Sequence, residues 1–207
     1  MIIQPTPTAV DVSEYQGHPN WKKANQSIVH FRGKTYRLTN GIAKVDQGSY
    51  TDPDFCYNWK QMKKVGIQRG AYSFIMWHGD GTKDARHFVR TILKCGVVMT
   101  SDYLWLDAEQ NGKGSQKANR QYLLTFMSTV HNLTHLDNSH IGIYSGKYYF
   151  EGAVGSGKPF AKRGYKSWVA AYTSAPLKIN GWPRLAWQAS DNVFVPGVGH
   201  SDFSLFK

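Results

Sequence analysis

Eight short apolar segments recur along this chain, and their spacing restricts its fold more than any other feature. Each segment is bounded by Gly, Pro, Ser or Asp, as is typical of buried β-strands. Segments with the periodicity of an amphipathic helix stand between several of them, at 55–65, 84–93 and 117–133. The eight predicted strands span residues 8–13, 41–45, 69–75, 103–106, 141–144, 168–171, 185–188 and 202–205.

This alternation of strands and helices predicts an α/β fold with a largely parallel sheet. Eight strands can close into a barrel, and the later strands have little helix between them. We therefore expect a single irregular (β/α) TIM-like barrel with fewer than eight helices. No linker rich in Pro, Gly or Ser divides the chain, so residues 1–207 are predicted to form one domain. Residues 27–40 resemble a β-hairpin that turns at Arg32-Gly33-Lys34, and we interpret them as an insertion before the second strand.

Two carboxylates, Asp107 and Glu109, follow the fourth predicted strand, at the end where such barrels hold their active sites. Residues two apart on a strand project to the same face, roughly 6.6–6.8 Å apart, so these acids should lie side by side. Their repulsion raises the pKa of one of them, and glycosidic cleavage requires a protonated acid beside an ionised one. Spacing alone leaves two alternatives open, namely solvated loop acids and a carboxylate pair that binds Mg²⁺.

The charge of the chain predicts a polyanionic partner. Lys and Arg number 25 against 14 Asp and Glu, which gives a formal net charge of +11. Nucleic acid, an anionic membrane and a cell wall that carries teichoic acids all qualify. The basic residues are scattered, and no segment approaches the roughly 18 apolar residues of a membrane span. We therefore expect a protein that binds neither nucleic acid nor membrane. We also expect it to be a monomer.

Three further features bear on compartment and cofactors. The opening residues, MIIQPTP, lack the basic start and apolar stretch of a signal peptide, so we expect synthesis in a cytoplasm. Cys56 and Cys95 form no CxxC pair, so we expect free thiols and no metal site, while a disulfide stays open as an alternative that this size does not need. Residues 152–158 nearly spell a phosphate-binding loop, but Pro159 replaces its Ser/Thr, and we expect no cofactor.

Sequence blocks along nearly the whole chain resemble, in the same order, those of the glycoside hydrolase family 25 lysozymes, the Chalaropsis type. Any one block is weak, but the ordered set is specific. The blocks are 11–17 (DVSEYQG), 43–48 (AKVDQG), 50–55 (YTDPDF), 70–74 (GAYSF), 106–109 (LDAE), 143–146 (IYSG), 168–172 (WVAAY), 187–190 (WQAS) and 196–197 (PG), followed by Asp202.

The resemblance implies a modified β/α barrel and muramidase activity, which is hydrolysis of the β-1,4 bond between N-acetylmuramic acid and N-acetylglucosamine in peptidoglycan. By position, Glu109 is the expected general acid, and Asp107 either polarises the substrate's N-acetyl group or acts in the second step. Asp11 and Asp202 are expected to complete the acidic floor of the site. The residues expected to bind the saccharide are Lys44, Tyr72, Tyr144, Trp168, Tyr172, Trp187 and Gln188.

Several points stay open at this stage. Ser73 stands where the family usually has His, which puts one polar contact in doubt. Retention, inversion and a substrate-assisted path all fit two carboxylates, and we favour the last because muramic acid carries an N-acetyl group. A phage endolysin, stored in the host cytoplasm and acting at the cell wall, would account for the N-terminus, and a secreted enzyme trimmed of its signal peptide would look the same. Two other functions are a wall-binding protein that has lost turnover and a basic nucleic-acid-binding protein.

Overall fold

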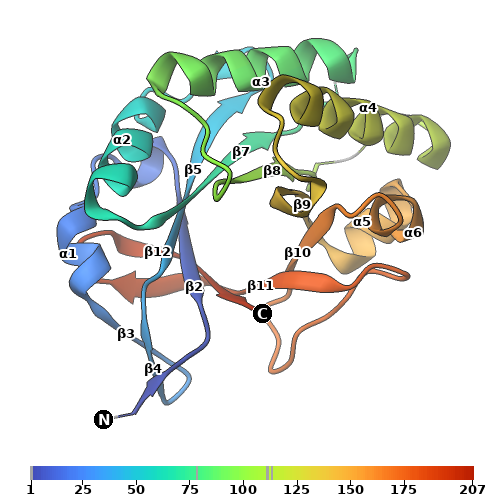
Figure 1. The fold of residues 1–207 in the computed structure, drawn as a ribbon. Helices are drawn as coiled ribbons and strands as arrows, with labels where there is room; N and C mark the ends of the chain where they lie inside the picture. Colours follow the sequence, from blue (N-terminus) through green and yellow to red (C-terminus); the bar gives the residue numbers. More distant parts are fainter. Residues whose placement is uncertain (1, 78, 111, 113) are drawn as a thin grey trace.

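Eight strands close into a barrel in the computed structural model, which describes residues 2–77, 79–110, 112 and 114–207 (Figure 1). The chain passes through the barrel wall largely in sequence order, so neighbouring strands are parallel, except that β12 runs antiparallel to both of its neighbours. The predicted strands and the largely parallel barrel are therefore confirmed. Around the barrel the strands are β2 (Thr8–Val12), β5 (Asn40–Gln47), β7 (Gln68–Phe74), β8 (Tyr103–Asp107), β9 (Ile141–Gly146), β10 (Lys166–Ala170), β11 (Arg184–Val195) and β12 (Gly199–Phe206).

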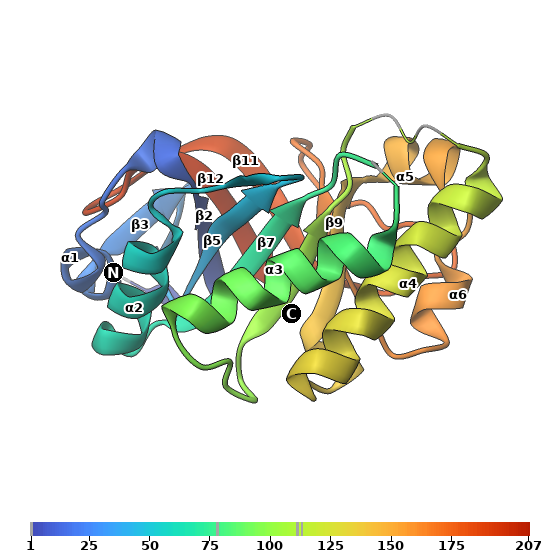
Figure 2. The ribbon, with the colours of Figure 1, turned by 90° about the horizontal axis from the view of Figure 1, so that it is seen from above.

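Helices cover the outside of the barrel (Figure 2). The three predicted helices are present as α2 (Phe55–Val65), α3 (Gly81–Cys95) and α4 (Gln116–Thr134). Three shorter helices were not predicted, because four to seven residues show too little periodicity. They are α1 (Trp21–Gln26), α5 (Lys147–Ala153) and α6 (Lys158–Ala161).

The alternation of side chains along each strand separates two apolar layers. Inward-facing residues, among them Trp105 and Trp168, fill the barrel interior below the site. Outward-facing residues, such as Leu104 and Val169, pack under the helices in a larger core. Because the interior is filled by side chains, space for a ligand is left only at the strand ends.

The segment 27–40 forms the predicted hairpin. Its strands are β3 (Ile28–Phe31) and β4 (Lys34–Arg37), and the turn lies at Arg32 and Gly33. The hairpin is extended by β1 (Ile3–Gln4), which pairs with β4 in a three-stranded sheet separate from the barrel. A further short strand, β6 (Tyr50–Thr51), pairs with the end of β5.

Cys56 and Cys95 form a disulfide, so the expectation of free thiols is wrong. Cys95 is the last residue of α3, and this end of the helix lies beside the first turn of α2, which contains Cys56. The two Cα atoms are 4.9 Å apart, within the range that a disulfide spans. The described part of the chain contains no helix that is long and apolar enough to cross a membrane.

Candidate active site

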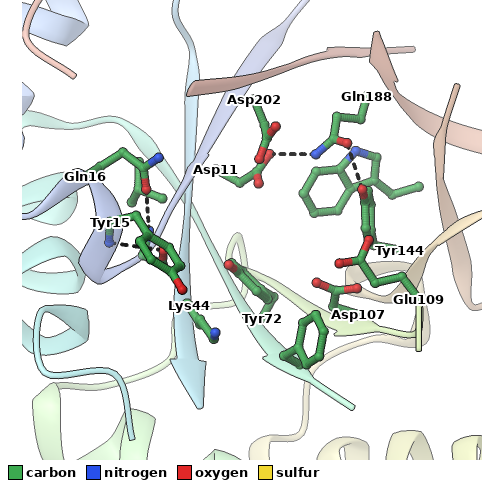
Figure 3. Close-up of a pocket in the computed structure, with 14 residues that line it drawn as sticks. Asp11, Tyr15, Gln16, Lys44, Tyr72, Asp107, Glu109, Tyr144, Gln188 and Asp202 are labelled. Atoms are coloured by element: carbon green, nitrogen blue, oxygen red, sulfur yellow. Dashed lines mark hydrogen bonds between the residues drawn. The ribbon is translucent and has the colours of Figure 1, made fainter. Parts of the chain in front are cut away.

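A cavity of about 230 Å³ opens at the C-terminal ends of the parallel strands (Figure 3). Most of the residues predicted for the site meet here, although they come from all eight strands of the barrel. The cavity is lined by Asp11, Val12, Ser13, Tyr15, Gln16, Lys44, Tyr72, Phe74, Asp107, Glu109, Tyr144, Trp168, Gln188 and Asp202.

The end of β8 presents Asp107 and Glu109 to this cavity. Ala108 points the other way, into the core under the helices, and its backbone N–H donates to the carbonyl of Tyr144 on β9. Asp107 is buried at the base of the cavity, whereas Glu109 is exposed at its mouth. The predicted arrangement of two acids on one face is therefore what the structure shows.

Burial raises the pKa of both carboxyls. For Asp107, burial and the nearby charge of Glu109 raise the pKa well above its usual range, and Lys44 opposes them. For Glu109, burial and the charge of Asp202 raise the pKa, while Tyr144 and Lys44 lower it. Asp107 Oδ1 is also buried without a hydrogen-bond partner among the described residues. Asp107 thus has a carboxylate oxygen that is free to accept a hydrogen bond, and Glu109 can exchange protons with solvent.

A second pair of acids, Asp11 and Asp202, forms across β2 and β12. The two residues are direct partners in the antiparallel ladder, so their side chains lie on the same face. Burial and the neighbouring carboxyl raise the pKa of Asp11 well above its usual range, and a hydrogen bond joins the two side chains. Burial also raises the pKa of Asp202, so both members of the pair keep their protons to a higher pH than a solvated aspartate does.

The side-chain amide of Gln188 joins this acid pair to two tyrosines. Its Nε2 donates to Asp11 Oδ2 over 3.2 Å. Its Oε1 accepts from the hydroxyls of Tyr144 and Tyr172, each at 2.7 Å. Tyr172 does not line the cavity itself, and it is half exposed at the rim. Gln188 therefore joins three strands, β2, β9 and β11, and the segment after β10 at the level of the carboxylates.

Lys44 supplies the cation that lines the cavity. It lies on β5, is buried, and its Nζ donates to Gln47 Oε1 at 2.8 Å. The same ammonium lies 5.3 Å from the ring centroid of Phe74. Tyr72, from the neighbouring strand β7, completes this wall. Lys44 lowers the pKa of Asp107 and Glu109 and so partly offsets the effect of burial on these two carboxyls.

The two tryptophans predicted for the groove differ in position. Trp168 faces the cavity from β10, and its indole N–H donates to Ser204 Oγ at 2.9 Å. Trp187 does not line the cavity, contrary to expectation, because it precedes Gln188 on β11 and so points to the opposite face of the strand. Its indole N–H donates to the carbonyl of Ala171, and its ring packs beside Arg32.

The turn after β2 supplies cavity residues that the sequence reasoning missed. Tyr15 and Gln16 lie in a short 3-10 helix, Glu14–Gln16, which Ser13 caps. A signal for them existed, because the block 11–17 follows a strand at the end of the barrel where the acids lie. Phe74 could have been found in the same way, since it is two residues beyond Tyr72 on the same face.

Ser73 lies outside the cavity. It points to the outer face of β7, where its hydroxyl donates to Asp46 Oδ1. The described residues contain no group of three or more His, Cys, Asp or Glu side chains that could hold a metal ion.

Comparisons with known proteins agree with this geometry. The profile of Glycosyl hydrolases family 25 matches residues 10–198. The Escherichia coli K12 protein YegX, described as uncharacterized, is 28% identical over 201 residues, covering 96% of this chain and 68% of YegX. The bacterial lysozyme from Streptomyces coelicolor superposes with a TM-score of 0.82 at 26% identity, covering 97% of this chain and 92% of that chain. The muramidase from Trichobolus zukalii superposes with a TM-score of 0.80 at 24% identity, covering 97% and 93%.

Proposed function

The chain belongs to glycosyl hydrolase family 25, and from this we propose that it is a muramidase, which hydrolyses the β-1,4 bond between N-acetylmuramic acid and N-acetylglucosamine in peptidoglycan. One observation carries the proposal: Asp107 and Glu109 share a cavity with a second acid pair, in a fold similar to that of a bacterial lysozyme. Glycosidases use a pair of carboxyl groups in different roles, and the different surroundings of these two carboxyls suit such a pair.

Glu109 acts as the general acid in this proposal. The pKa of Glu109 is raised, so its carboxyl stays protonated in a larger fraction of molecules than that of a solvated glutamate at the same pH. It is also exposed at the mouth of the cavity, where it can protonate the departing sugar oxygen and afterwards exchange with water. When the bond between the anomeric carbon and this oxygen breaks, its electron pair goes to the leaving oxygen, and Glu109 supplies the proton.

Asp107 orients the substrate's N-acetyl group. Its unpartnered Oδ1 at the base of the cavity can accept the amide N–H of that group, which would also favour the ionised carboxylate. The acetyl carbonyl oxygen then attacks the anomeric carbon as the bond to the leaving group breaks. Water subsequently opens the resulting ring and gives its proton back to Glu109. Tyr72, Tyr144 and Trp168 supply the walls against which sugar rings pack.

Substitution of the acids by amides tests this assignment. Glu109→Gln and Asp107→Asn should each lower the release of muropeptides from purified peptidoglycan by at least 100-fold, in the range of general acid catalysis, while binding to the wall persists. Asp80→Asn is a matched control, because Asp80 caps α3 away from the cavity and Asn caps equally well. Clearance of walls by Glu109→Gln at the normal rate would contradict the acid assignment.

Mass spectrometry of the products tests the bond that is cut. A muramidase leaves muramic acid at the reducing end, whereas glucosamine there would indicate a glucosaminidase. Wall binding by the wild-type protein without any sugar release would favour the non-catalytic alternative.

We further propose that the outer helices bind an anionic wall polymer such as a teichoic acid. Helices α1, α2 and α3 cover one side of the barrel (Figure 1). Together they carry nine Lys and Arg against one acid, Asp84, and all nine are exposed. None of the nine forms a salt bridge with another described residue. A phosphodiester polymer is a suitable partner for so many unpaired cations.

Binding to purified teichoic acid at two salt concentrations tests the proposed partner. The triple substitution of Lys60, Lys63 and Lys64 by Gln should weaken binding and reduce its salt dependence. A control with the same charge loss is the triple substitution of Lys117, Lys158 and Lys162, which lie on α4 and at α6. Equal effects of the two triple variants would contradict a specific cationic face. Tighter binding to DNA than to teichoic acid would favour the nucleic-acid alternative.

A further inference from the structure

The tip of the 27–40 hairpin reaches the barrel through one side chain, that of Arg32. Its guanidinium donates to the carbonyl of Thr173 at 2.7 Å and to that of Ala189 at 3.1 Å. It also lies 4.8 Å from the ring centroid of Phe31 and 5.3 Å from that of Trp187. Arg32 and Gly33 have positive φ angles of 50° and 72°, which the geometry of a two-residue hairpin turn requires.

The two carbonyls that Arg32 binds belong to irregular backbone. Ala189 falls at a shift in register between Gln188 and Ser190, where β11 bulges away from β12. Thr173 lies in the segment after β10 has ended. A bulge leaves backbone groups without their usual sheet partners, and the guanidinium supplies donors to both segments from outside the sheet.

These segments carry two side chains of the acidic site. Tyr172 immediately precedes Thr173, and Gln188 immediately precedes Ala189. Tyr172 donates to Gln188, which donates in turn to Asp11. The chain of contacts therefore runs from the hairpin tip through the backbone of two segments to the buried pair Asp11 and Asp202.

We infer that Arg32 is a positioning residue for glycosidic cleavage, which holds the segments of Tyr172 and Gln188 so that their side chains meet Asp11. It does not touch the cavity, and it acts only through these two segments. The inference rests on the proposed muramidase function for its kinetic consequences, but the contact itself has a consequence that does not depend on activity.

Hydrogen exchange measures that consequence directly. In Arg32→Ala, amide exchange should accelerate within 171–178 and 186–192 and stay unchanged in α4. Lys34→Ala is the matched control, because Lys34 is exposed on the same hairpin and removes the same charge. Exchange in Arg32→Ala that equals exchange in Lys34→Ala would overturn the inference, whether or not the protein cleaves peptidoglycan.

Kinetics then separate positioning from a merely structural role. Arg32→Ala should lower kcat about 10-fold with a smaller change in KM, and should shift the pH–activity profile upward, because a weakened bond from Gln188 no longer lowers the pKa of Asp11. Arg32→Lys keeps the charge but cannot donate to both carbonyls from one planar group, so it should give an intermediate kcat. Arg32→Lys also provides a test of the inference if Arg32→Ala does not fold.

The controls distinguish the possible failures. If the wild-type protein releases no muropeptides, the proposed function is wrong, but the hydrogen-exchange experiment still tests the contact of Arg32. An unchanged pH profile and an equal fall in kcat for Arg32→Lys and Lys34→Ala would defeat the positioning role alone.

Discussion

Gln188 and Asp11 lie 177 positions apart in the chain, yet the amide of one donates to the carboxyl of the other over 3.2 Å inside the barrel. This contact links β11 to β2, which are not neighbours, across the face of β12 that carries Asp202. It leaves the amide oxygen free to accept both Tyr144 and Tyr172. The acid pair is therefore oriented by a residue that belongs to neither of its strands.

Gln188→Glu should lower kcat/KM at least 10-fold, because a third carboxyl replaces the donor to Asp11. At pH 7 the change should cost about 1–3 kcal/mol of stability, since a buried group loses its partner beside like charge. The loss should shrink toward pH 4, where the new carboxyl is protonated and can donate. Urea unfolding at both pH values measures it. Gln121→Glu, on the exposed face of α4, should show neither effect.

The buried ion pair at the other end of the barrel predicts a different response. Arg69 binds both carboxylate oxygens of Asp102, and the two side chains are 3% and 2% exposed. Asp102→Ala should cost about 3–5 kcal/mol, because Arg69 would stay buried without a counter-charge. Denaturant unfolding checks the value. Lys147→Gln, which breaks a partly exposed pair with Glu151, should cost less than about 1 kcal/mol. Equal losses in the two variants would contradict the role given to burial.

The disulfide predicts a loss of stability without a loss of activity. Cys56→Ser with Cys95→Ser opens a loop with a sequence separation of 39 residues, which should cost about 3–4 kcal/mol. For a chain of this size the midpoint of thermal unfolding should fall by roughly 6–16 °C. The bond lies on the outside of the barrel, so peptidoglycan release at 25 °C should not change. A reductant should lower the midpoint of the wild-type protein but not that of the double variant.

Asp46 predicts a fall in stability as pH rises. Burial raises its pKa from 3.8 to about 7, and the charge of Asp84 adds to this, while Ser73 and Lys44 oppose it. Between these two values the folded chain keeps a proton that the unfolded chain has lost. The protonated carboxyl therefore contributes its full share to the free energy of unfolding below pH 4, and this share is lost as the pH rises to about 7. The share is at most roughly 4 kcal/mol.

Asp46→Asn checks this sign. The amide keeps an acceptor for Ser73 and cannot ionise, so the variant should unfold at a higher temperature than the wild type at pH 8. The difference should vanish near pH 4. His87, whose Nε2 lies 3.9 Å from Asp46 Oδ2, is the basic group that faces the carboxyl from α3. His87→Gln should leave most of the pH dependence in place, and its complete loss in that variant would assign the effect to the histidine.

The sequence alone predicts the strands and the longer helices because their signal is local. Apolar residues in 55–65 repeat along one helical face, and α2 has those bounds. The pair Asp107 and Glu109 was predictable for the same reason, since the alternation of a strand places both on one side wherever the strand lies. The remaining acids, Asp11 and Asp202, were expected only through the resemblance to a family.

Tertiary structure alone decided which distant segments meet. The pairing of Cys56 with Cys95 depends on where the end of α3 comes to lie, and nothing in either segment records this. The direction of Trp187 depends on which face of β11 turns inward after the barrel closes, and Gln188, its neighbour, takes the cavity instead. Local pattern determined the barrel strands, the longer helices and the acidic motif of this protein. Closure of the barrel determined the contacts among them, because contacts far apart in sequence are set by packing of the whole chain.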